Sequence, residues 1–109
     1  MTAEDLWNIC FPYCKPCLHD PLAIMDGGKV VSMLNRIPVA VCGYIAQYIY
    51  GVATHPDYRG RGFAGKLIRG ALQTPGYDLT ALVPENPSLI EFYEQFGFGT
   101  VSHTMRYKL

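Results

Sequence analysis

The chain has 109 residues, of which 50% are hydrophobic and 13% aromatic, and its nine Lys and Arg residues balance nine Asp and Glu residues. This length suits one domain, and the composition excludes a disordered tail. The balanced charge argues against nucleic acid as the main partner, because such proteins usually carry a basic excess. No apolar run approaches the roughly 20 residues that span a bilayer, and the acidic start lacks the basic residues of a signal peptide. We therefore expect a cytoplasmic protein with no membrane partner and with reduced cysteines.

The first half of the chain predicts a short helix, a hairpin and a long strand. The helix covers residues 3–11, with Leu6, Ile9 and Cys10 on one side, and three prolines keep the next segment irregular,.

Two apolar runs then flank residues 26–29, where adjacent glycines supply the positive φ of a tight hairpin turn,. The second arm runs on to Val41, with Pro38 at an edge or bulge. Cys42-Gly43 is a second turn, and β-branched and aromatic residues predict a long strand over 44–54,.

The second half alternates helices and strands. A wide apolar stripe at helical spacing predicts a helix that begins after Gly62 and ends at Pro75-Gly76,. Residues 77–83 are mostly apolar and predict a strand covered on both faces,. The stripe comprises Phe63, Ala64, Leu67, Ile68, Ala71 and Leu72.

A further helix is capped by Asn86, with Pro87 at its first position. A start at Ser88, whose capping box would include Glu91, is the alternative. Gly97 ends this helix, and its buried stripe comprises Leu89, Phe92, Tyr93 and Phe96.

Residues 104–109 alternate apolar and polar side chains, Met105, Tyr107 and Leu109 being the apolar ones, and predict a last strand with one solvated face,. This element order predicts an α/β (α+β) fold in which helices pack on a mixed sheet.

The loop between the long strand and the next helix predicts an anion site. Two arginines alternate with glycines directly before a helix N-terminus, whose unpaired N–H groups attract a phosphate or pyrophosphate. The spacing does not fit a P-loop. Gly60, Gly62 and Gly65 satisfy a dinucleotide fingerprint literally, but Gly65 lies within the helix and antiparallel strands precede the loop,.

Two ordered motifs resemble those of the GNAT superfamily of acetyl-CoA-dependent N-acetyltransferases. Arg59–Ala64 follows the pyrophosphate pattern [Q/R]-x-x-G-x-[G/A] after the strand segment 52–54. Asn86, Tyr93 and Gly97-Phe98 stand at the family spacing further on. The resemblance covers residues 44–98 and is nearest in motif to the branch of Eis-type aminoglycoside acetyltransferases, which are much longer chains.

The resemblance implies a GNAT-like, mostly antiparallel twisted sheet flanked by helices, in a single domain of residues 1–109 that is shortened at its N-terminus. It also implies transfer of an acetyl group from acetyl-CoA to a primary amine of a small molecule or peptide by direct attack. Tyr93 would protonate the departing thiolate, and the Val52 N–H would bind the thioester oxygen. The residues implied in binding acetyl-CoA are Val52, Ala53, Thr54, Arg59, Gly60, Arg61, Gly62, Phe63, Ala64 and Asn86.

The chain departs from the family pattern at the general base. The strand over 44–54 has no acidic residue, and its polar groups are Gln47, Tyr48 and Tyr50. Water that passes protons to bulk solvent, to His55 or to Glu85 is the other route. Family members also have a longer N-terminal segment, which walls the acceptor pocket. A partner subunit that completes the pocket, loose binding of acceptors, or a shortened family member would each explain the difference.

Three other readings stay open at this point. The high apolar content predicts a subunit contact, as in a homodimer. A non-catalytic acyl-CoA-binding or protein-interaction module of the same fold is the alternative function. One cluster resembles half of a zinc site and comprises Cys10, Cys14, Cys17 and His19. The spacing leaves little room for tetrahedral coordination of one ion, so we expect no metal.

Overall fold

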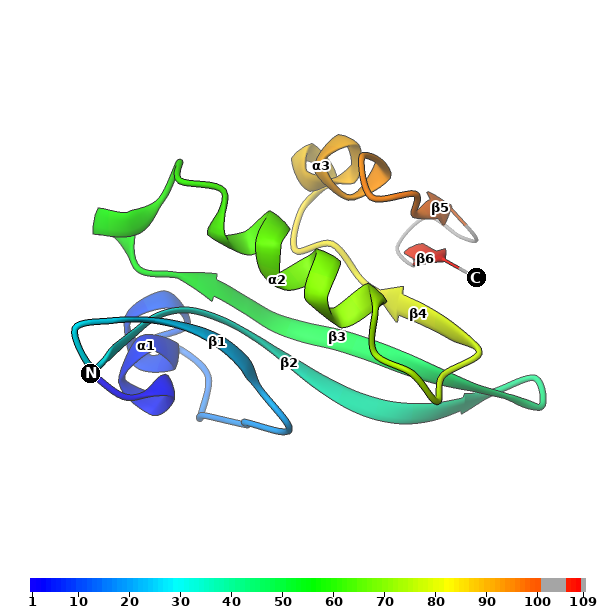
Figure 1. The fold of residues 1–109 in the computed structure, drawn as a ribbon, viewed down its shortest axis with the longest axis horizontal. Coiled ribbons are helices and arrows are strands. Elements are labelled where there is room, and N and C mark those ends of the chain that lie inside the picture. Colours follow the sequence, from blue (N-terminus) through cyan, green and yellow to red (C-terminus); the bar gives the residue numbers. More distant parts are fainter. Residues whose placement is uncertain (101–105, 109) are drawn as a thin grey trace.

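The computed structural model describes residues 1–100 and 106–108, and these form a six-stranded sheet with helices on both faces (Figure 1). The helices are α1 Ala3–Cys10, α2 Phe63–Leu72 and α3 Ile90–Glu94. The strands are β1 Leu22–Asp26, β2 Lys29–Val41, β3 Tyr44–Thr54, β4 Leu79–Leu82, β5 Gly99–Thr100 and β6 Arg106–Lys108. The predicted strand over 104–109 is described only at β6, and its positions Met105 and Leu109 lie outside the described residues.

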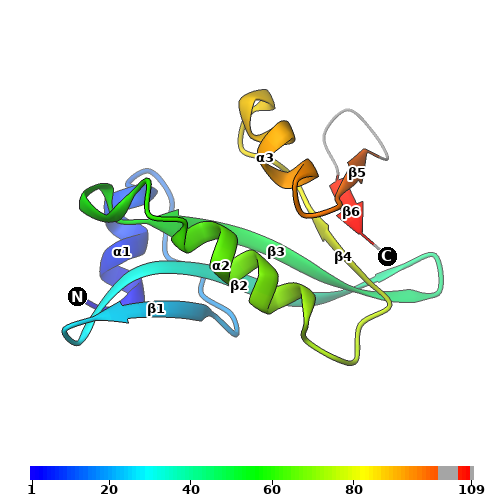
Figure 2. The same cartoon turned by 45° about the horizontal axis from the view of Figure 1, so that its top comes forward.

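The sheet order is β1-β2-β3-β4-β6-β5, and only the β3–β4 pair is parallel. The predicted class, a mixed and mostly antiparallel sheet flanked by helices, is therefore confirmed. α2 packs on one face against β2 and β3, whereas α1 packs on the opposite face of the same strands (Figure 2). Within the described helices, none is long and apolar enough to cross a membrane.

Both predicted turns are confirmed, and in each the backbone takes positive φ. Gly27 and Gly28 have φ of 57° and 81°, and Cys42 and Gly43 have φ of 49° and 84°. Pro38 lies on β2 beyond the last residue that pairs with β1, so its missing N–H costs no ladder hydrogen bond on that side,.

The buried side of α1 differs from the prediction. Its buried residues are Leu6 and Trp7, whereas Ile9 is 45% exposed. The large Trp7 ring packs against Tyr50 of β3, and its indole N–H donates to the Cys14 carbonyl at 3.1 Å. Burying this ring turns Ile9 toward solvent, because the two residues lie about 200° apart around the helix.

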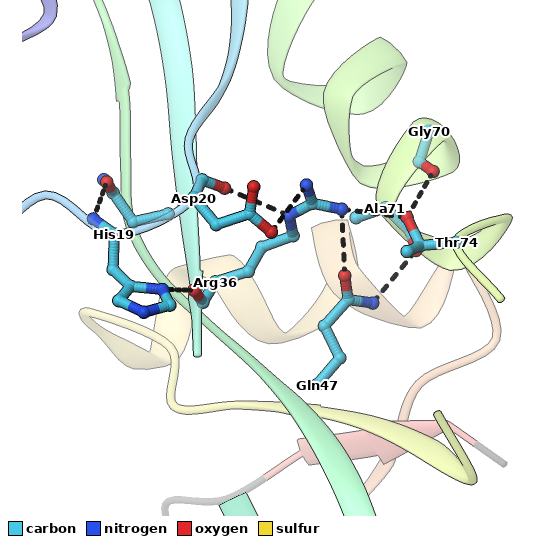
Figure 3. A network of polar contacts seen from close by, with 8 residues as sticks. His19, Asp20, Arg36, Gln47, Gly70, Ala71 and Thr74 are labelled. Carbon is cyan, nitrogen blue, oxygen red and sulfur yellow. Dashed lines mark hydrogen bonds and ion pairs between the residues drawn. The ribbon is translucent and has the colours of Figure 1, made fainter. Parts of the chain in front are cut away.

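A buried polar network ties the C-terminal end of α2 to the sheet (Figure 3). The Gln47 side chain donates to the Ala71 carbonyl at 2.9 Å and accepts from the Arg36 guanidinium at 3.4 Å. Arg36 also donates to Thr74 and pairs with Asp20 at 3.0 Å. Because these bonds occupy its amide under α2, Gln47 is not available as the general base that the sequence left open.

The prediction for the last helix is confirmed at its start. The Asn86 side chain accepts the Ser88 N–H at 3.1 Å, Pro87 follows it, and a 3₁₀ turn over Pro87–Leu89 leads into α3. The alternative start with Ser88 as the cap is not adopted. The helix ends earlier than predicted, at Glu94 with Gln95 as its C-cap, and Gly97, with φ of 90°, closes the turn that follows.

Candidate functional site

A β-bulge in β3 shapes the centre of the site. Met33 of β2 pairs with Ala53, and Asn35 pairs with Tyr50. Gly51 and Val52 therefore stand together opposite a single residue of β2, which is the definition of a bulge. Gly51 has φ of +58°, and a Cβ there would lie 2.7 Å from the Trp7 ring. The bulge was not predicted from the sequence, although a lone glycine inside a strand is its usual signal.

Beyond the bulge, β3 and β4 separate. Their parallel pairing ends at Ile49 and Leu82. From there β3 continues to Thr54 paired with β2 alone, while the segment after β4 turns toward α3 (Figure 1). An open cleft of about 830 Å³ lies between them. One edge of β3 is therefore without a strand neighbour along this stretch.

The peptide group of Thr54 faces this free edge, and Val52 lines the cleft beside it. The Ala53 carbonyl accepts the Ser32 hydroxyl, and the His55 N–H donates to the Val31 carbonyl, so both point toward β2. Because peptide groups alternate along a regular strand, that of Thr54, the residue between these two, points to the other edge. An extended ligand could add there as a further strand.

The N-terminus of α2 opens into the same cleft. Gly60 and Gly62 have φ of 80° and 78° and shape the loop before the helix. The first hydrogen bond of the helix runs from the Lys66 N–H to the Gly62 carbonyl at 3.1 Å. The N–H groups of the residues in between thus have no partner within the helix and carry the positive end of its dipole.

The two arginines of the loop differ in position. Arg59 lines the cleft, and its Nε donates to the Thr54 carbonyl at 3.0 Å. Arg61 instead lies over the Tyr58 ring at 4.7 Å and donates to the Asp57 carbonyl. All the site residues that the sequence predicted line the cleft except Arg61.

Tyr93 lies in the wall of the cleft and is 6% exposed. Its ring contacts Phe92 and Phe98 edge-on, at centroid distances of 5.1 and 6.0 Å. Burial raises the pKa of its hydroxyl, and the Glu85 carboxylate raises that pKa further. Among the described residues the hydroxyl has no hydrogen-bond partner, so it is a protonated donor available to a ligand.

Of the groups named for the general base, Tyr50 and Glu85 line the cleft, and Tyr48 and His55 do not. The Tyr50 hydroxyl donates to the Cys17 carbonyl at 2.7 Å. Burial, followed by interaction with the Cys17 side chain, raises the pKa of this hydroxyl. The Tyr50 hydroxyl therefore stays protonated at neutral pH, and a protonated phenol is a poor general base.

The cysteines do not form a cluster with other ligands in the described part of the chain, where no group of three or more His, Cys, Asp or Glu side chains could hold a metal ion. Cys10 instead lies at the cleft, with its thiol 3.6 Å from the Thr54 carbonyl. Cys14 and Cys17 are exposed free thiols.

A family model described as an acetyltransferase (GNAT) domain matches residues 3–101. The chain belongs to the GNAT acetyltransferase family. No curated protein sequence matches it closely enough to count as a relative.

Solved GNAT structures share the fold. A GNAT family acetyltransferase from Brucella melitensis, in complex with acetyl-CoA, superposes with a TM-score of 0.66 at 24% identity over 81% of this chain and 56% of its own. Naa50 of Arabidopsis thaliana, in complex with the bisubstrate analogue CoA-Ac-MVNAL, has a TM-score of 0.76 at 17% identity over 97% and 89%.

Eis1 of Mycobacterium abscessus is also similar, with a TM-score of 0.69 at 16% identity over 89% of this chain and 27% of its own. That identity shows the fold alone, so the nearness to the Eis branch stays a prediction. This GNAT chain spans little more than half the length of the Brucella protein that it matches.

Proposed function

We propose that this GNAT chain is an N-acetyltransferase that moves the acetyl group of acetyl-CoA to a primary amine, with residues 1–109 acting as one domain. The observation that carries the proposal is the free edge of β3 beyond the Gly51 bulge. The cleft along this edge also contains the N-terminus of α2, and Tyr93 lines the same cleft. Structures of the Brucella and Arabidopsis proteins with acetyl-CoA and a CoA analogue support this choice of co-substrate.

Each part of the cleft matches one part of acetyl-CoA. The N–H groups that begin α2, from Phe63 on, would hold the pyrophosphate, with the Arg59 guanidinium adding positive charge. The pantetheine arm, which carries amide groups, would lie along Val52, Ala53 and Thr54 like an added strand and pair with the backbone groups there that do not bond to β2. Asn86 would contact that arm from the other wall.

The chemistry needs no protein nucleophile, because an amine attacks a thioester directly. The cleft must align the two reactants, stabilise the charge on the thioester oxygen and assist the departing thiolate. The Val52 N–H serves the oxygen. Tyr93 serves the sulfur, since its raised pKa keeps the hydroxyl protonated at neutral pH and able to donate as negative charge develops,.

The test is CoA release from acetyl-CoA in the presence of primary amines, followed with a thiol reagent. The panel should include small amines and the peptide Met-Val-Asn-Ala-Leu, the sequence of the Arabidopsis analogue. Tyr93→Phe, which keeps the packed ring, should lower turnover by about 100-fold or more and leave binding of acetyl-CoA unchanged. Tyr44→Phe, 54% exposed at a distant turn, is the matched control. Binding of acetyl-CoA without release of CoA with any amine would instead identify a non-catalytic module.

A further inference from the structure

The charges along the cleft are separated. In the part of the chain that the structure describes, the charged side chains lining it are Arg59 and Glu85. Arg59 is bonded to Thr54, at the end where α2 begins. The pairing of β3 with β4 ends at Ile49 and Leu82. Glu85 follows Leu82 by three residues, and Val52 follows Ile49 by three residues. Glu85 and Val52 line the same cleft, and the Glu85 carboxylate lies near enough to Tyr93 to raise the pKa of its hydroxyl.

Glu85 is free to meet a ligand at this position. The ion pairs of the described residues, Arg36 with Asp20 and His55 with Asp57, do not involve it. Its negative charge adds to the effect of burial in raising the pKa of the Tyr93 hydroxyl, so the two groups lie within electrostatic reach of each other,. A cation placed between the two groups would lie beside the thioester in the proposed complex.

The surroundings of Glu85 restrict what the cation can carry. Val83, two residues before Glu85, is 44% exposed in the cleft, and Phe11 and Tyr50 add aromatic surface elsewhere in its lining. No basic side chain among the described lining residues stands at this end to balance a second carboxylate. An amine that bears its own carboxylate would therefore meet repulsion from Glu85 and lose contact with that apolar surface.

We propose that Glu85 selects and deprotonates the acceptor, which is a primary ammonium carried on an uncharged apolar group without a neighbouring carboxylate. The inference rests on the proposed function and names the acceptor class for the same site. It excludes free amino acids and admits monoamines and amidated amino acids.

The proton balance of the reaction is closed by this assignment. The ammonium gives one proton to the Glu85 carboxylate, which is exposed and returns it to water. The neutral amine then attacks the thioester carbon, and the C–N bond forms as the C–S bond breaks. Tyr93 gives its proton to the departing sulfur, and the second proton, which leaves the nitrogen as the amide forms, passes through water to restore the Tyr93 hydroxyl. The products are the amide, the CoA thiol and one solvent proton.

The first test is a binding measurement that does not depend on turnover. L-Phenylalaninamide, its deaminated analogue 3-phenylpropanamide and L-phenylalanine are titrated calorimetrically at pH 6.5, where an α-amino group is protonated. Titrations use the protein alone and with CoA. The wild type should bind L-phenylalaninamide about 3- to 10-fold more tightly than the other two, the range expected for a partly exposed ion pair.

Glu85→Gln should reduce this preference to less than about twofold, whereas Glu94→Gln, an exposed α3 carboxylate outside the cleft lining, should keep it,. A wild type without the preference, or one whose preference survives in Glu85→Gln, would overturn the inference. Loss of acetyl-CoA binding would overturn the proposed function separately.

The second test addresses the proton-accepting role. With L-phenylalaninamide as acceptor, Glu85→Gln should lower kcat/KM strongly at pH 6.5 and much less at pH 9, where the amine is already neutral. An equal loss at both pH values would contradict proton acceptance by Glu85 and leave it a charge that only attracts the ammonium.

Discussion

Replacing Gly51 by alanine tests the bulge on which the site depends. The residue has φ of +58°, a conformation that costs an ordinary L-residue about 1–2 kcal/mol,. The added Cβ would also stand 2.7 Å from the Trp7 ring and 2.8 Å from the Asn35 amide.

The clash is costly because neither neighbour can yield. Trp7 is 7% exposed and Asn35 is fully buried, with its amide donated to the Gly51 carbonyl. Overpacking of this kind costs about 1–3 kcal/mol. The total of about 2–5 kcal/mol is a large share of the roughly 5–15 kcal/mol by which a domain is usually stable.

Urea unfolding of the variant beside Gly43→Ala separates the two costs. Gly43 has φ of +84°, but a Cβ there meets nothing within 4 Å, so this control carries only the backbone cost. We expect Gly51→Ala to lose at least about 1 kcal/mol more than the control, since it alone adds the clash. Equal losses for the two variants would refute the packing argument and with it the bulge geometry.

Three further changes probe the network, the buried phenol and the loop. Gln47→Leu leaves the Ala71 carbonyl and part of the buried Arg36 guanidinium without hydrogen-bond partners. It should therefore lower the free energy of unfolding by about 1–3 kcal/mol per lost partner. An unchanged urea midpoint would be inconsistent with the network. The raised pKa of Tyr93 means that the folded state holds this proton more tightly than the unfolded chain, so its contribution is complete below pH about 10 and is lost as pH rises through the folded pKa,. Tyr93→Phe should therefore lose less stability than the wild type between pH 9 and 11.5, and parallel losses would count against a buried phenol. Arg59→Gln should weaken acetyl-CoA binding about threefold or more, whereas Arg61→Gln, whose side chain lies outside the cleft lining, should have a smaller effect,; the reverse order would contradict the placement of the two arginines.

The elements that could be predicted from the sequence are those whose signals are local. Adjacent Gly27 and Gly28 leave few backbone choices other than a tight turn, and an asparagine followed by proline marks the start of the last helix,. The stripe of α2 is equally local, because its period is set by the helix itself. The approximate position of the cleft could also be predicted, because the anion loop and Tyr93 stand at fixed spacing in the sequence from these elements.

The features that were missed depend on contacts between distant residues. The bulge at Gly51 is set by Trp7 and Asn35, which lie 44 and 16 positions away along the chain. The side of α1 that is buried follows from where that Trp7 ring fits. Arg61 turns from the cleft because the ring of Tyr58 offers it a cation–π contact, which no spacing rule reveals,.

The most direct measurement of the central claim is calorimetric titration of the wild type, Gly62→Ala and Gly62→Glu with acetyl-CoA. Gly62 has φ of +78° with nothing within 4 Å of an added Cβ, so both variants bear the same backbone strain and only the glutamate brings negative charge to the start of α2. The account predicts micromolar binding by the wild type, modestly weaker binding by Gly62→Ala, and none by Gly62→Glu. Absence of binding to the wild type, or equal affinity in the two variants, would contradict it.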